Sequence, residues 1–124
     1  MNVLVEELDA DSEAIGLTKR QLQTDVELRL RTAGVKLDDS ARPNLYLNVL
    51  VLHDPEQQDV AYNVSLAFQQ WGTFDGGFRG SGTTWDESAV GRAGEARAAR
   101  YIREHVGDKV DMFLNDYLKA NPKQ

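Results

Sequence analysis

The chain has 124 residues, no cysteine and a formal net charge of −6, from 14 Lys and Arg against 20 Asp and Glu. Its length is typical of one domain, and we expect residues 1–124 to form a single α+β domain. The negative charge makes nucleic acid an unfavourable partner. The missing cysteines exclude disulfides, thiolate metal sites and cysteine nucleophiles, and no apolar run is long enough to cross a bilayer.

A strand is expected at the start of the chain, where the apolar run 3–5 follows Met1 almost directly. We interpret this abrupt beginning as the place where a leader or upstream segment was removed, which favours an exported protein. The acidic stretch Glu6–Glu13 then predicts a solvated loop. Its spacing differs from that of a calcium-binding loop and it lacks the glycine of such a loop, so no cation site is expected there.

The clearest element is a helix over Lys19–Ala33. Thr18 and Gln21 have the spacing of a capping box at its start. Gly34 can close the helix by adopting a left-handed conformation. The expected buried residues are Leu22, Val26, Leu30 and Ala33, and the expected i,i+4 ion pairs are Asp25–Arg29 and Glu27–Arg31.

Strands dominate the middle of the chain. A short extension at Val35–Leu37 is an optional strand, and a turn follows over Asp38–Asn44. The segment Leu45–His53 is apolar on both faces, which predicts a central strand. From Val60 onward apolar and polar residues alternate strictly, which predicts one buried face and one wet face. The wet face would carry Asn63, Ser65, Gln69 and Trp71.

A hairpin is predicted after this strand, because the dipeptide Asp75–Gly76 is a strong signal for a two-residue turn. Such a turn sets the register of the two strands. It would place Trp85 opposite Leu66, on the core side. It would also place Trp71 opposite Gly80, where the indole could cover the glycine.

The C-terminal part is expected to contain a loop and a long helix. Glycines interrupt the segment Asp86–Gly94, which predicts a loop. The helix should begin near Gly94 or Glu95 and continue to Ala120, with Asn121 and Pro122 ending it. Its expected buried stripe is Ile102, Val106, Val110, Phe113 and Tyr117.

The order of these elements is β-α-(β)-β-β-β-α. It predicts a two-layer α+β sandwich, in which a mixed sheet of four or five strands carries both helices on one face. The expected core contains Val49, Val51, Val64, Leu66, Trp85, Leu30, Ile102 and Phe113. The other face of the sheet would then be free to bind a partner.

Both histidines have ordinary structural explanations. His53 lies at a strand end beside Asp54, and no known motif ties a nucleophile to it. The acids of the segment Glu104–Asp111 lie on a different stripe of the helix from His105, which argues against a metal site. The glycines of Gly76–Gly82 lack the following helix of a phosphate-binding loop. We therefore expect no catalytic residue, cofactor or metal.

Three aromatic residues are candidates for binding a partner. Trp71, Phe74 and Phe78 could crown the hairpin with exposed aromatic surface, which often marks a contact site. The alternative is that a helix or loop covers them, which would make them part of the core.

A second candidate group is basic. Arg97, Arg100 and Arg103 share one face near the N-terminal end of the last helix, where positive charge opposes the helix dipole. Such an unfavourable placement favours a partner. The alternative is that these arginines pair with Glu95, with Glu104 or with the acids near the first strand.

The chain also resembles a known group of proteins. The segments that carry the resemblance are "LRTAGVKL", "PNLYLNVLVL", "TTW" and "DMFLNDYLKANP". In their order they resemble small bacterial periplasmic or lipoprotein-associated domains, similar in outline to the N-terminal domain of the Tol-system propeller protein and to the lipopolysaccharide-assembly lipoprotein. The resemblance implies two helices against a mixed sheet, and action through protein or lipid contacts without catalysis.

We therefore expect a non-enzymatic interaction or accessory module of the bacterial cell envelope, periplasmic or otherwise extracytoplasmic, with a protein or an envelope component as partner. Three alternatives stay open. The first is a small hydrolase or ligand-binding enzyme near His53, which would need a deep cleft lined by this residue and two acids. The second is a cytoplasmic location. The third is a homodimer formed through an open sheet edge or the wet face.

Overall fold

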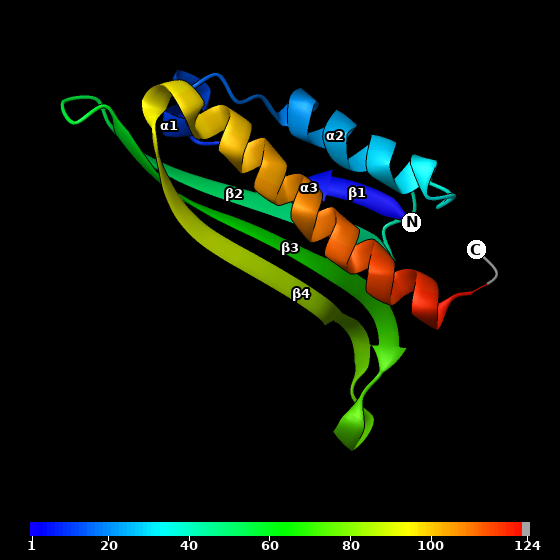
Figure 1. The fold of residues 1–124 in the computed structure, drawn as a ribbon. Helices are drawn as coiled ribbons and strands as arrows, with labels where there is room; N and C mark the ends of the chain where they lie inside the picture. Colours follow the sequence, from blue (N-terminus) through cyan, green and yellow to red (C-terminus); the bar gives the residue numbers. More distant parts are fainter. Residues whose placement is uncertain (123–124) are drawn as a thin grey trace.

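The computed structural model describes residues 1–122, which form a curved sheet with two long helices on one face (Figure 1). The elements in chain order are β1 (Asn2–Val5), α1 (Ala10–Ala14), α2 (Lys19–Thr32), β2 (Asn44–Asp54), β3 (Asp59–Thr73), the short 3₁₀ helix η1 (Asp75–Gly77), β4 (Arg79–Gly94) and α3 (Glu95–Ala120). The sheet has four strands in the order β1-β2-β3-β4.

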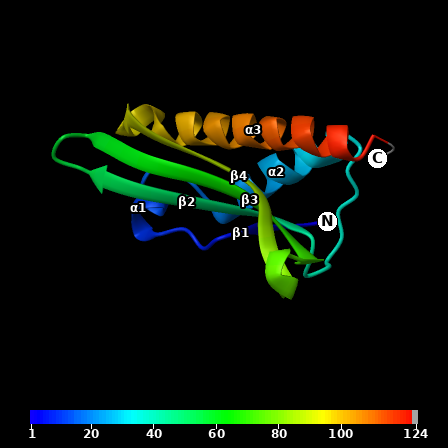
Figure 2. The ribbon, with the colours of Figure 1, turned by 90° about the horizontal axis from the view of Figure 1, so that it is seen from below.

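The sheet is mixed, because β1 is parallel to β2 whereas β2, β3 and β4 are antiparallel neighbours. In Figure 2, α2 and α3 lie on the same side of the strands. The predicted two-layer α+β architecture is therefore confirmed. Residues 35–37 are irregular, so the optional fifth strand is absent from the sheet that residues 1–122 form.

Both predicted ends of the first long helix are confirmed. Thr18 Oγ1 accepts a hydrogen bond from the backbone N–H of Gln21, and the Gln21 side chain accepts one from the N–H of Thr18, both at 3.1 Å. This is the reciprocal pattern of a capping box. At the other end Gly34 has a φ of 89°, and the N–H of Val35 donates to the carbonyl of Leu30 at 3.0 Å. This arrangement satisfies a carbonyl that the ending helix would otherwise leave free.

The prediction of a loop over the acidic stretch is wrong, because part of the stretch forms α1 and lies against the sheet edge, whereas most of its acidic side chains are exposed as predicted. Asp9 caps α1 by accepting from the N–H of Ser12 at 2.8 Å. Its second carboxylate oxygen accepts from the N–H of Val51 at 3.5 Å, and Asp11 accepts from the N–H of His53 at 3.1 Å. β1 is too short to pair with this part of β2, so carboxylates take the place of the missing strand.

The predicted register of the hairpin is wrong. Gly77 as well as Gly76 has a positive φ, so the turn extends beyond the Asp75–Gly76 dipeptide. The loop is Phe74–Phe78, and the N–H of Phe74 donates to the carbonyl of Phe78 at 2.7 Å. Longer loops of this kind are common in hairpins with glycine. As a result Trp71 lies opposite Ser81 and not opposite Gly80.

A β-bulge then changes the register once more. Phe68 lies opposite Trp85 and Gln69 lies opposite Thr83, which leaves Thr84 as an extra residue on β4. The predicted partner of Trp85, Leu66, is therefore wrong. The predicted side of the sheet is confirmed, since the Trp85 ring packs on Phe113 in α3, with ring centroids 5.2 Å apart.

The prediction of a loop over Asp86–Gly94 is also wrong, because β4 continues through it as the partner of β3. The small residues on the helix side of this strand leave room for larger neighbours. A Cβ on Gly91 would lie 2.5 Å from the Tyr62 ring, which crosses the glycine. A glycine inside a strand often marks such a close approach.

The last long helix and its buried stripe are confirmed, with Tyr117 only partly buried. Ion pairs join α3 to α2: Arg103 to Asp25 and Arg29 to Asp111, both at 2.8 Å. A Cβ on Gly107 would lie 2.6 Å from the Arg29 guanidinium, so this glycine lets Arg29 reach across α3. The predicted pair Asp25–Arg29 is therefore wrong, because both partners bind the other helix.

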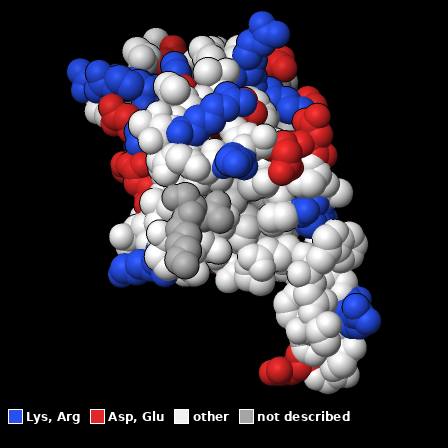
Figure 3. Space-filling model, turned by 90° about the vertical axis from the view of Figure 1, so that its right-hand side faces the viewer, with Lys and Arg blue, Asp and Glu red and all other residues white. Residues whose placement is uncertain are grey.

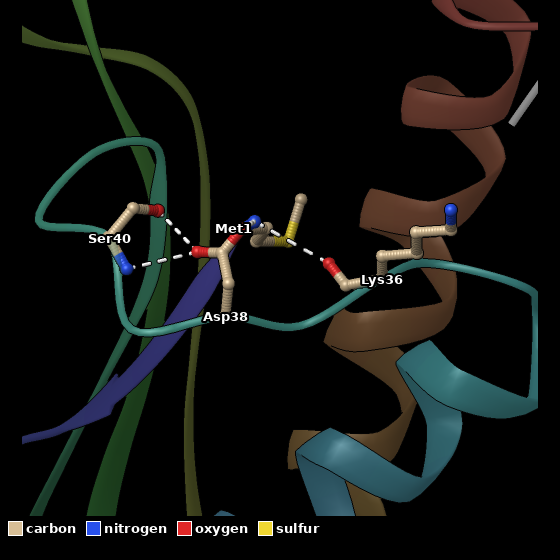
Figure 4. Close-up of polar contacts among 4 residues, drawn as sticks. All are labelled: Met1, Lys36, Asp38 and Ser40. Carbon is tan, nitrogen blue, oxygen red and sulfur yellow. Dashed lines mark hydrogen bonds and ion pairs between the residues drawn. The ribbon is translucent and has the colours of Figure 1, made fainter.

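The second predicted pair within α2 is confirmed, with Glu27 and Arg31 3.8 Å apart. Near the start of β1, the Met1 ammonium lies 3.1 Å from Asp38 and donates to the carbonyl of Lys36 at 3.4 Å (Figure 4). Within residues 1–122 we find no helix with the length and apolar composition that a membrane span needs.

Candidate partner-binding surfaces

The face of the sheet turned away from α2 and α3, here called the open face, carries exposed aliphatic side chains. Leu50 and Leu52 of β2 are 55% and 74% exposed, and Val90 of β4 is 77% exposed. β3 runs between them, with Asn63 opposite both Leu50 and Val90, and with Ala61 opposite Leu52. Larger side chains on the outer two strands therefore flank smaller ones on the middle strand.

This difference in size produces a shallow groove of about 850 Å³ along β3. Its flanking strands are about 10 Å apart, because neighbouring strands are spaced by about 4.8 Å. Arg92 lies at one margin, where its Nε donates to Asp59 at 3.1 Å. This contact raises the pKa of Arg92 and lowers that of Asp59. Asp9 lies at another margin, and although burial opposes it, hydrogen bonds from Ser12 lower its pKa.

The open face becomes polar toward the hairpin. Asn48, Ser65 and Ser88 form the next row across β2, β3 and β4. In the row after that, the hydroxyl of Tyr46 is hydrogen-bonded to Glu6, which raises the pKa of Tyr46. The face therefore has one apolar end and one polar end.

The sequence did not single out the apolar end. The apolar pattern of Leu45–His53 on both faces correctly predicted a strand between two others, yet Leu50 and Leu52 are exposed. That two-sided pattern was the available signal. Val90 was missed because its segment was predicted to be a loop. The predicted wet-face residues Asn63 and Ser65 do lie on the open face.

The second surface is the hairpin arm, defined as residues 69–83 beyond the bulge. The arm projects from the rest of the molecule (Figures 1 and 3). Trp71 and Phe78 are exposed, and the Phe78 ring lies 6.0 Å from that of Phe74. Asp75 and Arg79 are its only charged residues. The structure thus gathers the three aromatic candidates on one projecting element.

The glycines of the arm make room for its aromatic rings. A Cβ on Gly82 would lie 2.6 Å from the Phe74 ring, and one on Gly80 would lie 3.0 Å from the Phe78 ring. The glycine opposite the predicted indole is therefore in contact with a phenylalanine instead. Such contacts give the arm a small packing core of its own.

Trp71 is also in contact with a residue outside the arm. The Arg42 guanidinium lies 5.9 Å from the centre of the Trp71 ring, and its Nε donates to Ser81 Oγ at 2.7 Å. A cation over an indole is a favourable contact. The base of the arm is therefore attached to the turn that precedes β2.

The basic candidates do not form one site with the aromatic ones, because α3 begins at the end of the molecule away from the arm (Figure 1). Arg103 donates two hydrogen bonds to Asp25, which raises the pKa of Arg103. Arg100 lies 3.7 Å from Glu104, and Arg97 is exposed. Two of the three arginines therefore contact acids of their own chain.

His53 is in contact with Glu95 at the start of α3. Its Nε2 lies 2.7 Å from a Glu95 carboxylate oxygen, and its side chain is 14% exposed. Neither the open-face groove nor a hollow of about 790 Å³ between α2 and α3 includes His53. Across residues 1–122, no group of three or more histidine or acidic side chains is placed to hold a metal.

Comparison with known proteins finds similarity among solved structures. A scan against protein-family models and a search of curated proteins found no match. Among solved structures, the chain is similar to rare lipoprotein B from Shewanella oneidensis, with a TM-score of 0.46 and 15% identity over 98% of this chain and 96% of that chain. At these values the similarity assigns no function to any residue.

Proposed function

We propose that the protein is a non-enzymatic docking module of the bacterial cell envelope, which binds an apolar segment of a partner protein in the open-face groove. One observation carries the proposal. Leu50, Leu52 and Val90 are large aliphatic side chains that lie together on the open face and are 55% to 77% exposed. Apolar side chains gathered on one surface typically mark a protein contact.

The expected occupant is an amphipathic helix of the partner. The groove lies between ridges whose strands are about 10 Å apart, so an α-helix about 10–12 Å in diameter would lie along the ridges and direct one row of its apolar side chains into the groove. Its floor of Ala61 and Asn63 leaves space for apolar side chains that enter from above. The polar groups of Arg92 and Asp9 at the margins would face the polar side of such a helix.

Burial of the three aliphatic side chains has a limited free energy. Complete burial of such a side chain contributes roughly 1.5–3 kcal/mol. Part of this gain offsets the translational and side-chain entropy lost on association. A contact confined to the groove would therefore be transient, and a tighter complex needs further area, which the hairpin arm could supply with Trp71 and Phe78.

Binding in the groove can be tested with a photo-crosslinking amino acid at position 52. We expect one defined partner adduct from envelope extract, and no such adduct from the same amino acid at position 28, because Leu28 is exposed on α2 and lies outside the groove. The purified partner should then bind the wild type in calorimetry. Val90→Glu should weaken binding at least about tenfold, or by about 1.4 kcal/mol.

The matched control is Leu28→Glu, which adds the same charge on the helical side and should leave the affinity unchanged. Equal loss in both variants, or no loss in Val90→Glu, would contradict groove binding. Thermal unfolding of each variant checks that the charge has not disturbed the fold, because both parent side chains are largely exposed.

The envelope location is supported by the sequence resemblance to periplasmic and lipoprotein-associated domains. Its test is separate from that of the groove. Cells that express the tagged natural gene are fractionated, and we expect the protein in the periplasmic or membrane fraction. Recovery with the cytoplasmic proteins would refute the location and leave the binding proposal to its own experiment.

A further inference from the structure

The two edges of the sheet differ in how their backbone groups are satisfied. At the β1 edge, the free part of β2 donates to Asp9 and Asp11, and the carbonyl of Val3 accepts from the Gln23 side chain at 3.0 Å. At the other edge, β4 is 16 residues long. A long uncovered edge strand presents unpaired N–H and C=O groups to any other strand.

The hydrogen-bond pattern shows which groups of β4 point outward. The N–H of Glu95 donates to the carbonyl of Gln58 at 3.0 Å, in the same register in which Ala93 lies opposite Val60. Backbone groups alternate in direction along an antiparallel strand. The odd-numbered residues between 85 and 95 therefore direct their backbone N–H and C=O groups toward β3. The even-numbered residues 86–94 direct theirs outward, away from the sheet. Within residues 1–122 no hydrogen bond uses these outward groups.

We propose that this edge pairs with the same edge of a second copy of the chain. The two β4 strands run antiparallel about a two-fold axis at Ala89, and they join the two four-stranded sheets into one continuous sheet. The regular part of β4 that would pair is residues 85–93, because the bulge at Thr84 ends it on one side and α3 begins beyond it on the other.

Charge selects the register of this pairing. A two-fold axis at Ala89 places Asp86 opposite Arg92 of the copy, and Arg92 opposite the copy's Asp86. An axis at Ser88 or at Val90 would leave both charges opposite uncharged residues. Opposite charges directly across an antiparallel pair stabilise it. The surface is thus complementary to itself, which is the requirement for a symmetric dimer.

The Arg92 side chain is available for this contact. It is 77% exposed and uses Nε and Nη2 to bind Asp59 of its own chain. Its remaining nitrogen, Nη1, has no hydrogen bond within residues 1–122. One guanidinium can therefore bind a carboxylate on each side, because it presents donors in a planar fork.

The pairing is distinct from the proposed function, since it uses backbone groups at an edge whereas the groove uses side chains on a face, although Arg92 lies at the margin of both. Sedimentation velocity over a wide concentration range should show a dimer of the wild type. Ser88→Pro removes an outward N–H and leaves the hydrogen bonds to β3 intact, so it should sediment as a monomer. Its unfolding temperature should match that of the wild type at low concentration, where the wild type is also monomeric, because dimerisation itself raises the unfolding temperature. A wild type that stays monomeric at every concentration would overturn the proposal.

Leu52→Glu is the matched control, because it changes the open face and leaves the edge intact. It should remain dimeric. Loss of the dimer in this variant would show that the copies meet through their faces, which also overturns the edge proposal.

Charge exchange tests the register. Arg92→Asp places acid opposite acid and should raise the dimer dissociation constant, whereas the double variant Asp86→Arg with Arg92→Asp should restore it. A double variant no tighter than the single one would refute this register. Thermal unfolding of each variant separates loss of the dimer from loss of the fold.

Disulfide formation measures the register directly, because the chain has no cysteine of its own. In the proposed dimer Ala89 lies opposite itself in a non-hydrogen-bonded pair, at a Cα separation of about 4.5 Å. This separation suits a disulfide. Ala89→Cys should therefore crosslink on mild oxidation, whereas Ser88→Cys, opposite Val90, should not. Crosslinking of Ser88→Cys without that of Ala89→Cys would overturn the proposal even if a dimer forms.

Discussion

The two faces of the sheet are built from the same strands and have different surroundings. On the covered face Val49, Val51 and Val64 lie under α2 and α3 and are almost completely buried. On the open face Leu50, Leu52 and Val90 have similar apolar side chains and are exposed. The alternation along a strand thus shows which side chains share a face. In β3 the polar residues also show which face is open, whereas β2 is apolar on both faces and its sequence does not show which face the helices cover.

The sharpest test of the comparison replaces with alanine one large residue of α3 that packs on the covered face and one large residue on the open face. Phe113 is 2% exposed and packs on Phe68 and Trp85, so Phe113→Ala should lower the free energy of unfolding by about 3–5 kcal/mol. Leu52→Ala should change it by no more than about 0.5 kcal/mol. Urea unfolding measures both values. A large loss for Leu52→Ala would mean that the open face is covered in solution.

Gly91→Ala tests the closeness of packing on the covered side. The added Cβ would meet the buried Tyr62 ring at 2.5 Å, and this ring is also held by His105, with centroids 5.6 Å apart. We expect a loss of about 1–3 kcal/mol, typical of overpacking. Tyr62→Leu in the same chain should relieve part of it. Additive effects of the two substitutions in urea unfolding would show that they do not touch.

Much of the fold followed from local patterns. The capping box at Thr18, the closing Gly34 and the buried stripe of α3 are each specified by residues a few positions apart. The wrong predictions concern contacts between distant segments. The acidic residues near Asp9 accept hydrogen bonds from N–H groups of β2, a strand 42 residues away in the sequence. Gly91 likewise has its role through the Tyr62 ring, which lies against it from another strand.

The candidate sites follow the same rule. The aromatic residues of the arm were recognised because they stand close together in sequence around a turn. The groove was missed because its side chains come from β2 and β4, which are neighbours of β3 and not of each other. The basic cluster was recognised, but the acids that bind Arg103 and Arg29 lie on the partner helix and follow no local spacing.

Removal of an ion pair between α2 and α3 is expected to have a smaller effect on the free energy of unfolding. The Arg103–Asp25 pair is bidentate but partly exposed, so Arg103→Ala should cost about 0.2–1 kcal/mol. A double-mutant cycle with Asp25→Ala in low and high salt measures the coupling. Arg97→Ala is the control. A coupling of several kcal/mol would mean that charge, rather than apolar packing, holds α2 against α3.

The smallest expected effect is a dependence of stability on pH that comes from Asp38. Hydrogen bonds from Ser40, followed by the Met1 ammonium, lower the pKa of Asp38 from 3.8 to about 2. A carboxyl group with a lowered pKa in the folded state stabilises the protein above its unfolded pKa. This contribution is lost as the pH falls from about 4 to about 2. Asp38→Asn should therefore flatten the acid-induced loss of stability in that range. An unchanged pH profile in thermal unfolding would show that the contact is not formed.

The extra residue at Thr84 separates the two parts of the long ribbon formed by β3 and β4. A bulge adds one residue to one strand, so the side chains of that strand can point to different faces on the two sides of the bulge. The projecting part can therefore gain or lose single residues during evolution while Phe68 and Trp85 stay beneath α3. Relatives of this protein can be expected to differ most in the length and composition of that projection, with the sheet beneath the helices kept constant.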